Sequence, residues 1–315
     1  MNELHLVTGG AGFIGSHLVE TLVAKGLQVR VFDNFSTGLR ANIQALSPGV
    51  KILDGDLRDK TAVLQAAAGV SVVYHLGALP SVQRSVENSV ATHEVCATGT
   101  LHGLDAARRN RVRRVVYASR SSVYGGASKS EGQTEDTPPR PCSPYAAAKL
   151  AGEYYAEVFA TVYALEMVSL RFFNIFGPRQ RAGNPYSGVI AVFIAAMTKG
   201  RRPVVHGDGL QSRDFTYVAN AVQAMMSAAE TDGVSGRAYD VGTGRSITIL
   251  DLVATLNRLL GTELIPQHVA GRPGDFRYSC ADISAARREL KYEPTCSFED
   301  GLKRAISWVS LVLQD

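Results

Sequence analysis

Short apolar runs alternate with amphipathic stretches along the first half of the chain. Each run is bounded by glycine or polar residues and is too short for a helix, which favours a buried strand. Strands are expected at residues 4–8, 28–33, 51–53, 72–76, 114–119 and 167–171. Helices are expected at residues 13–24, 61–68, 98–109 and 145–163. Buried strands linked by helices are typical of a parallel sheet covered on both faces.

After residue 173 the pattern loosens. Loops rich in Gly, Pro and Arg separate helices expected near residues 187–198, 219–229, 249–260 and 298–309. A chain of 315 residues is compatible with two domains at roughly 150 residues each. We predict an α/β fold with a doubly wound, Rossmann-type parallel sheet over residues 1–173, to which residues 214–245 return. A smaller, partly interleaved α/β domain is expected over residues 174–315.

Composition narrows the classes of protein. Apolar residues make up 45% and charged residues 20% of the chain, near globular averages, which argues against disorder. No apolar stretch is long enough for a transmembrane helix, and the segment from Met1 to His5 lacks the features of a secretory signal. We therefore expect a soluble, cytoplasmic protein without a membrane partner.

Charge and cysteine content point away from nucleic acid and metal. The net charge is +4, and the arginines within residues 108–114 lack interleaved aromatics, which indicates a solvated helix end rather than a nucleic-acid site. The cysteines form no C-x-x-C pair, and no histidine cluster has zinc spacing. We expect buried free thiols, as in a reducing compartment, and no metal.

A glycine-rich segment follows the first expected strand and opens the first expected helix. Its glycines are Gly9, Gly12 and Gly15. The first permits a tight turn, the second lets the backbone approach a pyrophosphate, and the third lets the helix pack close to the sheet. The helix N-terminus then offers free N–H groups to phosphate. In this strand–turn–helix context, the motif predicts a dinucleotide site.

Asp33 ends the second expected strand, where a carboxylate can bind the ribose diol of adenosine. Such a carboxylate repels a 2′-phosphate, which favours NAD over NADP; the alternative is an Asp that caps a turn. Asp56 and Leu57 follow the third strand, as neighbours of the adenine or as parts of a structural turn.

Tyr145 and Lys149 form a Y-x-x-x-K pair at the start of a helix, just after Pro144. The i, i+4 spacing puts both side chains on one helix face. A lysine ammonium beside the phenol is expected to lower the tyrosine pKa from about 10. The pair thus predicts a tyrosine that acts as a base near neutral pH.

Together these segments resemble the extended short-chain dehydrogenase/reductase family over nearly the whole chain. The motifs are Gly9 to Gly15, Asp33 to Gly38, Gly55 to Leu57, Ser122 to Gly125, Ser143 to Tyr145 with Lys149, Arg171 to Asn174, Gly207 to Gly209 and Ser212 to Phe215. The chain is most similar to 4-epimerases of UDP-hexoses, especially those that accept N-acetylated sugars. The resemblance implies that Tyr145 deprotonates the sugar 4-hydroxyl while the C4 hydride passes to tightly held NAD. The 4-keto sugar then rotates, and hydride returns to its other face.

The resemblance also implies the binding residues. For NAD it implies Gly9, Gly12, Phe13, Ile14, Gly15, Asp33, Asn34, Ser36, Thr37, Gly38, Asp56, Leu57, Leu76, Ala78, Tyr145, Lys149 and Phe173. For the UDP-sugar it implies Ser81, Asn174, Val189, His206, Arg213, Arg272, Asp275 and Ser279. Ser279 stands at a gatekeeper position, where a small side chain leaves room for an acetamido group. We therefore expect UDP-GlcNAc and UDP-GalNAc as substrates beside UDP-Glc and UDP-Gal. The family's usual homodimer is expected to form through residues 98–109 and 145–163.

Two positions depart from the family pattern. Arg120 stands where the family carries a catalytic Ser or Thr. An arginine is permanently charged, so it either stabilises a developing oxyanion by donation or obstructs the sugar. Ser121 or Ser122 is the candidate replacement for the lost hydroxyl. Cys96 stands where relatives commonly carry Asn near the nicotinamide. Either the cofactor or the loop is less ordered as a result, or the surrounding residues repack without effect.

Two other functions stay open. Dehydratases and decarboxylases of this family carry an acidic residue at the position of Ser122, so these activities are disfavoured. A UDP-uronic acid 4-epimerase is an alternative, if Arg120 meets a C6 carboxylate. The second alternative is a protein that binds NAD and UDP-sugar without turnover, and it is suggested by Arg120 and Cys96.

Overall fold

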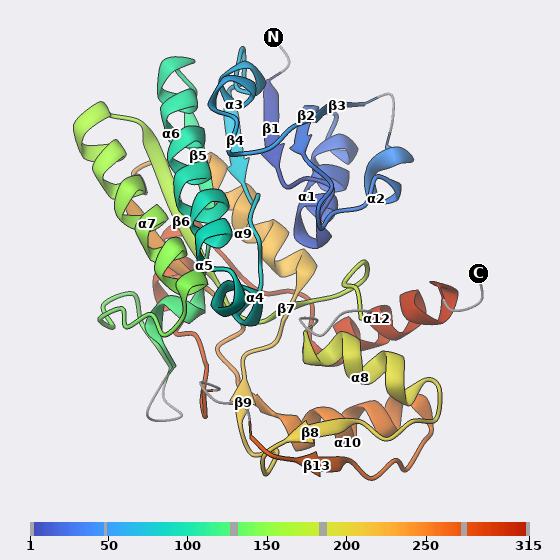
Figure 1. Cartoon of the computed structure of the whole chain (residues 1–315). Coiled ribbons are helices and arrows are strands. Elements are labelled where there is room, and N and C mark those ends of the chain that lie inside the picture. Colours follow the sequence, from blue (N-terminus) through green and yellow to red (C-terminus); the bar gives the residue numbers. More distant parts are fainter. Residues whose placement is uncertain (1–2, 47–48, 127–131, 183–187, 272–275, 313–315) are drawn as a thin grey trace.

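A seven-stranded parallel sheet forms the centre of the protein in the computed structural model (Figure 1). The structure describes residues 3–46, 49–126, 132–182, 188–271 and 276–312. The strands are β1 (Leu4–Thr8), β2 (Gln28–Asp33), β3 (Val50–Asp54), β4 (Val72–His75), β5 (Arg114–Arg120), β6 (Glu166–Phe172) and β11 (Arg237–Val241). Their order is β11-β6-β5-β4-β1-β2-β3, with every neighbouring pair parallel. The predicted doubly wound sheet is confirmed.

Helices cover both faces of this sheet because successive strand residues point to opposite sides. In β1, Leu6 packs into the core that also contains side chains of α3 (Lys60–Ala66), α6 (Gly99–Arg109) and α7 (Pro144–Tyr163). Its neighbour Val7 packs into the core on the other face. That core contains side chains of α1 (Phe13–Ala24), α9 (Val218–Glu230) and α11 (Ser284–Leu290).

A smaller region with its own apolar core forms beside the sheet. It contains α8 (Val189–Met197), α10 (Ile249–Leu260) and α12 (Phe298–Val312), grouped at the lower right of Figure 1. Short strands pair around it: β7 (Ile175–Phe176) with β10 (Thr216–Tyr217), β8 (Val204–His206) with β13 (Gln267–Val269), and β9 (Ser212–Arg213) with β12 (Ile247–Thr248). The chain returns to the sheet through α9 and β11, so the interleaved architecture is confirmed. The division at residue 173 stays a prediction.

The helix expected at residues 98–109 is α6, which begins at Gly99. It is preceded by α4 (Val82–Glu87), α5 (Ser89–His93) and the π-helical turn η1 (Glu94–Thr98). The hydroxyl of Ser81 caps α4 by accepting from the N–H of Arg84 at 3.0 Å, and Asn88 caps α5. Several apolar residues of α4 and α5 are exposed, so the sequence carries no core-facing apolar pattern there.

The helices α2 (Ala41–Gln44) and α11 and the edge strand β11 escaped prediction, as did the six short strands named above. The first two are short helices, and β11 contains Arg237 and Asp240, which interrupt the apolar run expected of a buried strand. Asp240 is nevertheless fully buried and accepts hydrogen bonds from the hydroxyl of Tyr124, 2.9 Å from each carboxylate oxygen. The formation of β11 therefore depends on a tertiary hydrogen bond, which the local sequence pattern does not reveal.

Within the described ranges, no helix is both long and apolar enough to cross a membrane. The same part of the chain holds no group of three His, Cys, Asp or Glu side chains that could ligate a metal ion. All four cysteines are free thiols, with Cys96 and Cys280 buried and Cys296 half-buried. Cys142 is exposed, so the expectation of burial is wrong for this residue.

Candidate active site

A cavity of about 1430 Å³ opens at the carboxyl ends of the parallel strands. It is lined by residues that follow or end β1 to β6, and by parts of α4, α7 and α8. The strand order reverses between β1 and β4, and ligands of open α/β sheets bind at such a point. Pockets for one small molecule measure about 300–1,000 Å³. This cavity is therefore large enough for two ligands.

The glycine loop approaches the sheet too closely for side chains. Gly9 has a φ of +69°, and a Cβ atom on it would lie 2.8 Å from the backbone nitrogen of Gly77. A Cβ atom on Gly15 would overlap the carbonyl oxygen of Gly9. Gly12 precedes α1 without a side-chain cap, which leaves the first N–H groups of that helix available to an anion. The predicted roles of Gly9 and Gly15 therefore fit the geometry.

Asp33 links the end of β2 to this loop. Its Oδ2 accepts from the N–H of Ala11 at 2.9 Å, and its Oδ1 accepts from the N–H of Phe35 at 2.8 Å. Burial raises the pKa of the Asp33 carboxyl, against the lowering effect of these two hydrogen bonds. A carboxylate has about four acceptor positions, so Asp33 keeps capacity for hydroxyl donors in the cavity.

Asp56 forms part of a hydrogen-bonded turn at the same end of the cavity. Arg58 donates to both carboxylate oxygens at 3.0 and 2.8 Å, and the amide of Asn34 donates to Oδ2 at 2.8 Å. The hydrogen bonds from Arg58 hold the pKa of Asp56 well below its usual range. Asp56 is thus part of a structural turn and also lines the cavity, and its place beside an adenine stays a prediction.

The start of α7 carries the predicted Tyr–Lys pair. Ser143 caps this helix by accepting from the N–H of Ala146 at 3.2 Å, and Pro144 occupies the first turn. Tyr145 and Lys149 are both buried, one helical turn apart, and both line the cavity. The Nζ of Lys149 donates to the carbonyl oxygen of Ala118 on β5 at 2.8 Å. This bond joins the helix to the neighbouring strand end.

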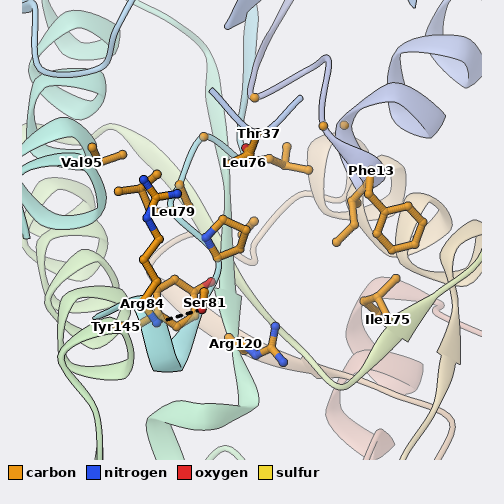
Figure 2. A pocket seen from close by; sticks show the side chains of 18 of the residues that line it. Phe13, Thr37, Leu76, Leu79, Ser81, Arg84, Val95, Arg120, Tyr145 and Ile175 are labelled. Atoms are coloured by element: carbon orange, nitrogen blue, oxygen red, sulfur yellow. Dashed lines mark hydrogen bonds between the residues drawn. The ribbon is translucent and has the colours of Figure 1, made fainter. Parts of the chain in front are cut away.

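The predicted lowering of the tyrosine pKa by Lys149 is wrong for this structure. Burial raises the pKa of Tyr145 to about 12, and the charge of Arg120 together with a hydrogen bond to its side chain partly opposes this effect. Burial also lowers the pKa of the Lys149 amine. Tyr145 and Arg120 lie in the lower part of the view in Figure 2, and Phe13 lies at the upper right. The cation that acts on the phenol is therefore Arg120.

Of the replacement hydroxyls, only Ser122 reaches the cavity. Ser122 lines it, whereas Ser121 is outside the lining. The Oγ of Ser122 is buried and has no hydrogen-bond partner among the residues that the structure describes. A buried hydroxyl without a partner is costly, so a group in the cavity that hydrogen-bonds to it is favoured.

Cys96 fixes the loop after β4. Its Sγ accepts from the N–H of Leu79 at 3.4 Å, and its side chain packs with Tyr145 and Ala148. The loop contributes Leu76, Ala78 and Ser81 to the cavity wall. The side chain of Cys96 is fully buried and does not line the cavity. Its role in this chain is therefore to hold the loop after β4 in place.

The other predicted site residues divide into two groups. In the lining are Gly9, Gly12, Phe13, Ile14, Gly15, Asp33, Asn34, Ser36, Thr37, Asp56, Leu57, Leu76, Ala78, Ser81, Asn174 and Val189. Outside it are Gly38, Phe173, His206, Arg213 and Ser279. Arg272 and Asp275 lie outside the described residues. Gly38 instead packs on the glycine loop, since a Cβ atom there would lie 2.7 Å from the carbonyl carbon of Ala11.

The structure adds cavity residues that the sequence reasoning missed. They include Arg84 on α4, Arg179 and Arg181 after β7, and Phe276. The helix that carries Arg84 had a signal in the sequence, because serine is a residue type that favours helix N-caps and Ser81 caps α4. No local signal marks Phe276, which reaches the cavity through tertiary folding. Arg179 is paired with Glu20 at 2.7 Å.

Comparisons with known proteins agree with this architecture. Residues 6–305 match the family model described as GDP-mannose 4,6 dehydratase. The UDP-glucose 4-epimerase of Mycolicibacterium smegmatis is 34% identical over 312 residues, covering 96% of this chain and 97% of the relative.

Two solved structures are also similar over nearly the full length. One is a UDP-N-acetylglucosamine 4-epimerase from Methanobrevibacter ruminantium, in complex with UDP-N-acetylmuramic acid. It is 35% identical with a TM-score of 0.94, covering 100% of this chain and 99% of the other. The other is a variant of the UDP-glucuronic acid 4-epimerase from Bacillus cereus, in complex with a fluorinated UDP-glucuronic acid and NAD. It is 31% identical with a TM-score of 0.91, covering 98% of this chain and 99% of the other.

Proposed function

Because this chain belongs to the extended short-chain dehydrogenase/reductase family, we propose that it is an NAD-dependent 4-epimerase of UDP-hexoses. The observation that carries this proposal is the buried Tyr145–Lys149 face of α7 within the cavity that also contains the glycine loop. The cavity volume of about 1430 Å³ supports simultaneous binding of a dinucleotide and a nucleotide sugar.

The cofactor is proposed to be NAD, which supplies a hydride acceptor and donor when bound. The glycine loop and the N-terminus of α1 fit a diphosphate, because free N–H groups lie there and the three glycines carry no side chain. Asp33 fits the adenosine ribose diol and disfavours a 2′-phosphate by charge repulsion. The relative from Bacillus cereus was solved with NAD, which supports the same assignment.

The residues of this chain would move the proton. Tyr145 accepts the proton of the sugar 4-hydroxyl as hydride leaves C4, and returns it when hydride comes back to the other face. The cation of Arg120 favours the phenolate of Tyr145, which is the form that accepts a proton. The free Oγ of Ser122 is a hydrogen-bonding partner for a sugar hydroxyl in the same cavity.

Acceptance of N-acetylated sugars remains a separate proposal. From the family resemblance, Ser279 is the residue expected to leave space for the acetamido group. This residue is buried outside the cavity lining, and its carbonyl oxygen accepts from the N–H of Asp214 at 2.8 Å. Support for acetylated substrates therefore rests on the similarity to the Methanobrevibacter enzyme.

The test is an epimer assay on protein of known cofactor content. The purified protein is denatured to identify the released dinucleotide, and native protein is incubated with UDP-GlcNAc and, separately, UDP-Glc. We expect released NAD rather than NADP, and the C4 epimer of at least one sugar on chromatography. UDP-glucuronic acid forms a third arm.

If protein that contains NAD forms no epimer from any of the three sugars, the 4-epimerase proposal is refuted. The second candidate, a protein that binds both ligands without turnover, then takes its place. It is favoured by the raised pKa of Tyr145 and by the arginine at position 120.

We also propose a homodimer. The outer face of α7 exposes Tyr154, Tyr155, Val158 and Val162, and the exposed Val86 lies on the neighbouring α4. A contiguous apolar face of this kind is typical of an interaction surface. Light scattering is expected to give the mass of two chains. Val158→Lys is expected to shift the mass toward one chain, and a wild-type monomer at micromolar concentration would contradict the proposal.

A further inference from the structure

We propose that Arg120 selects hexoses that carry a carboxylate, so that the preferred substrates of this site are UDP-hexuronates. The inference rests on the proposed function, since it assigns the reacting sugar to the Tyr145 end of the cavity. Arg120 is the last residue of β5 and lines the cavity beside Tyr145 (Figure 2). The preceding residue, Ser119, donates to the carboxylate of Glu153 on α7, which fixes the end of the strand.

The charge of Arg120 has no acidic partner within the described residues. Two other arginines that are buried in the sheet are paired: Arg171 with Glu153 at 2.7 Å, and Arg114 with Glu166 at 2.5 Å. Arg120 interacts instead with the neutral phenol of Tyr145. Lys149 adds a second cation nearby, and its Nζ contacts a backbone carbonyl rather than a carboxylate.

Three acidic residues line the cavity: Glu87 on α4, and Asp33 and Asp56 at the ends of other strands. Asp33 ends β2, which is separated from β5 by β1 and β4. Three strand spacings amount to about 14 Å, which exceeds the Debye length of about 8 Å at physiological salt. Asp56 follows β3, the edge strand beyond β2, and its carboxylate accepts hydrogen bonds from Arg58. Neither Asp33 nor Asp56 therefore compensates the cation at the end of β5, which makes Arg120 a candidate partner for an anionic group of a ligand.

The position of that group on the ligand follows from sugar chemistry. Epimerisation requires the 4-hydroxyl at Tyr145, and the diphosphate is attached at C1, across the ring from C4. C6 is bonded to C5, the neighbour of C4, so a carboxylate at C6 lies close to the 4-hydroxyl and to the side chains around Tyr145. A guanidinium matches a carboxylate with two parallel hydrogen bonds. A neutral hydroxymethyl group at C6 cannot compensate the positive charge of the Arg120 guanidinium.

The first measurement is binding without turnover. In a Tyr145→Phe background with bound NAD, calorimetry gives the Kd of UDP-glucuronic acid and of UDP-glucose. We expect the uronate to bind about 10- to 100-fold tighter, the range for a hydrogen bond between charged groups. Arg120→Ser is expected to abolish this ratio, and Arg120→Lys to keep part of it. Arg288→Ser is the matched control, because Arg288 is exposed on α11, is paired with Glu289 and lies outside the cavity.

The second measurement is turnover in proteins that keep Tyr145. The wild-type protein is expected to epimerise UDP-glucuronic acid with a higher kcat/KM than UDP-glucose, and Arg120→Ser to reverse this order. Equal Kd values for the two sugars, or a ratio that Arg120→Ser leaves unchanged, would overturn the inference. A uronate preference in binding with no epimer from any sugar would support the inference and refute the proposed function.

Discussion

Tyr145→Phe is expected to lower kcat for epimerisation by about 10²- to 10⁴-fold, the usual contribution of a positioned acid–base group. The phenol is the titratable side chain that the α7 helix and Arg120 hold in the cavity. The variant removes one oxygen atom and keeps the ring, so the packing of Cys96 and Ala148 is retained. NAD content and the Kd of the UDP-sugar are expected to stay near the wild-type values.

Tyr154→Phe is the matched control, because Tyr154 lies on the same helix with its side chain exposed. It is expected to leave kcat unchanged. The pH profile adds a second readout. Since burial raises the pKa of Tyr145 to about 12, the phenolate fraction falls as pH falls, and the wild-type rate is expected to rise with pH through the neutral range. A Tyr145→Phe variant with wild-type activity would exclude Tyr145 as the base.

Glu153→Gln is expected to lower the free energy of unfolding by about 3–5 kcal/mol, because it removes the carboxylate that compensates the buried charge of Arg171. Both side chains are almost fully buried, and Glu153 accepts from Nε and Nη2 of Arg171 at 3.0 and 2.7 Å. Arg171 also donates to the hydroxyl of Tyr124 at 2.7 Å. The pair therefore joins α7 to β6 through the centre of the protein, and urea denaturation measures its removal.

Glu293→Gln provides the comparison on the surface. Glu293 pairs with Arg287 at 2.8 Å, but both side chains are exposed, so the loss is expected to stay below about 1 kcal/mol. Replacing both Glu153 and Arg171 by Met is expected to recover much of the lost stability, since no unpaired charge remains. Equal losses from Glu153→Gln and Glu293→Gln would contradict the argument.

Most of the sheet could be predicted from the sequence because six strands contain short apolar runs bounded by polar or glycine residues. Residues 4–8 and 28–33 were predicted with the bounds that β1 and β2 have. The seventh strand could not be predicted, since Asp240 looks like a surface residue until Tyr124 is folded against it. The apolar pattern of the sequence thus predicts strands that are stabilised by burial of apolar side chains. It does not predict a strand such as β11, which depends on a buried polar contact.

The candidate site divides in the same way. The glycine loop and the Tyr145–Lys149 pair are local in sequence, so their spacing predicts their chemistry. The direction of the Tyr145 pKa is different, because it depends on burial by Cys96 and Leu79, which belong to other segments. The importance of Arg120 for that pKa depends equally on the distance between β5 and α7, which no spacing in the sequence gives.

The late return of α9 and β11 to the sheet has a consequence for biosynthesis. When a nascent chain has released residues 1–173 from the ribosome, the faces of Val168 and Leu170 that pack with Ala221, Met225 and Tyr239 are still uncovered. The N-terminal part can pair the edge of β6 only after residue 241 has emerged, and it can complete this core only after α11 has emerged. Until then it exposes apolar surface and an unpaired strand edge at β6, the kind of surface that chaperones bind.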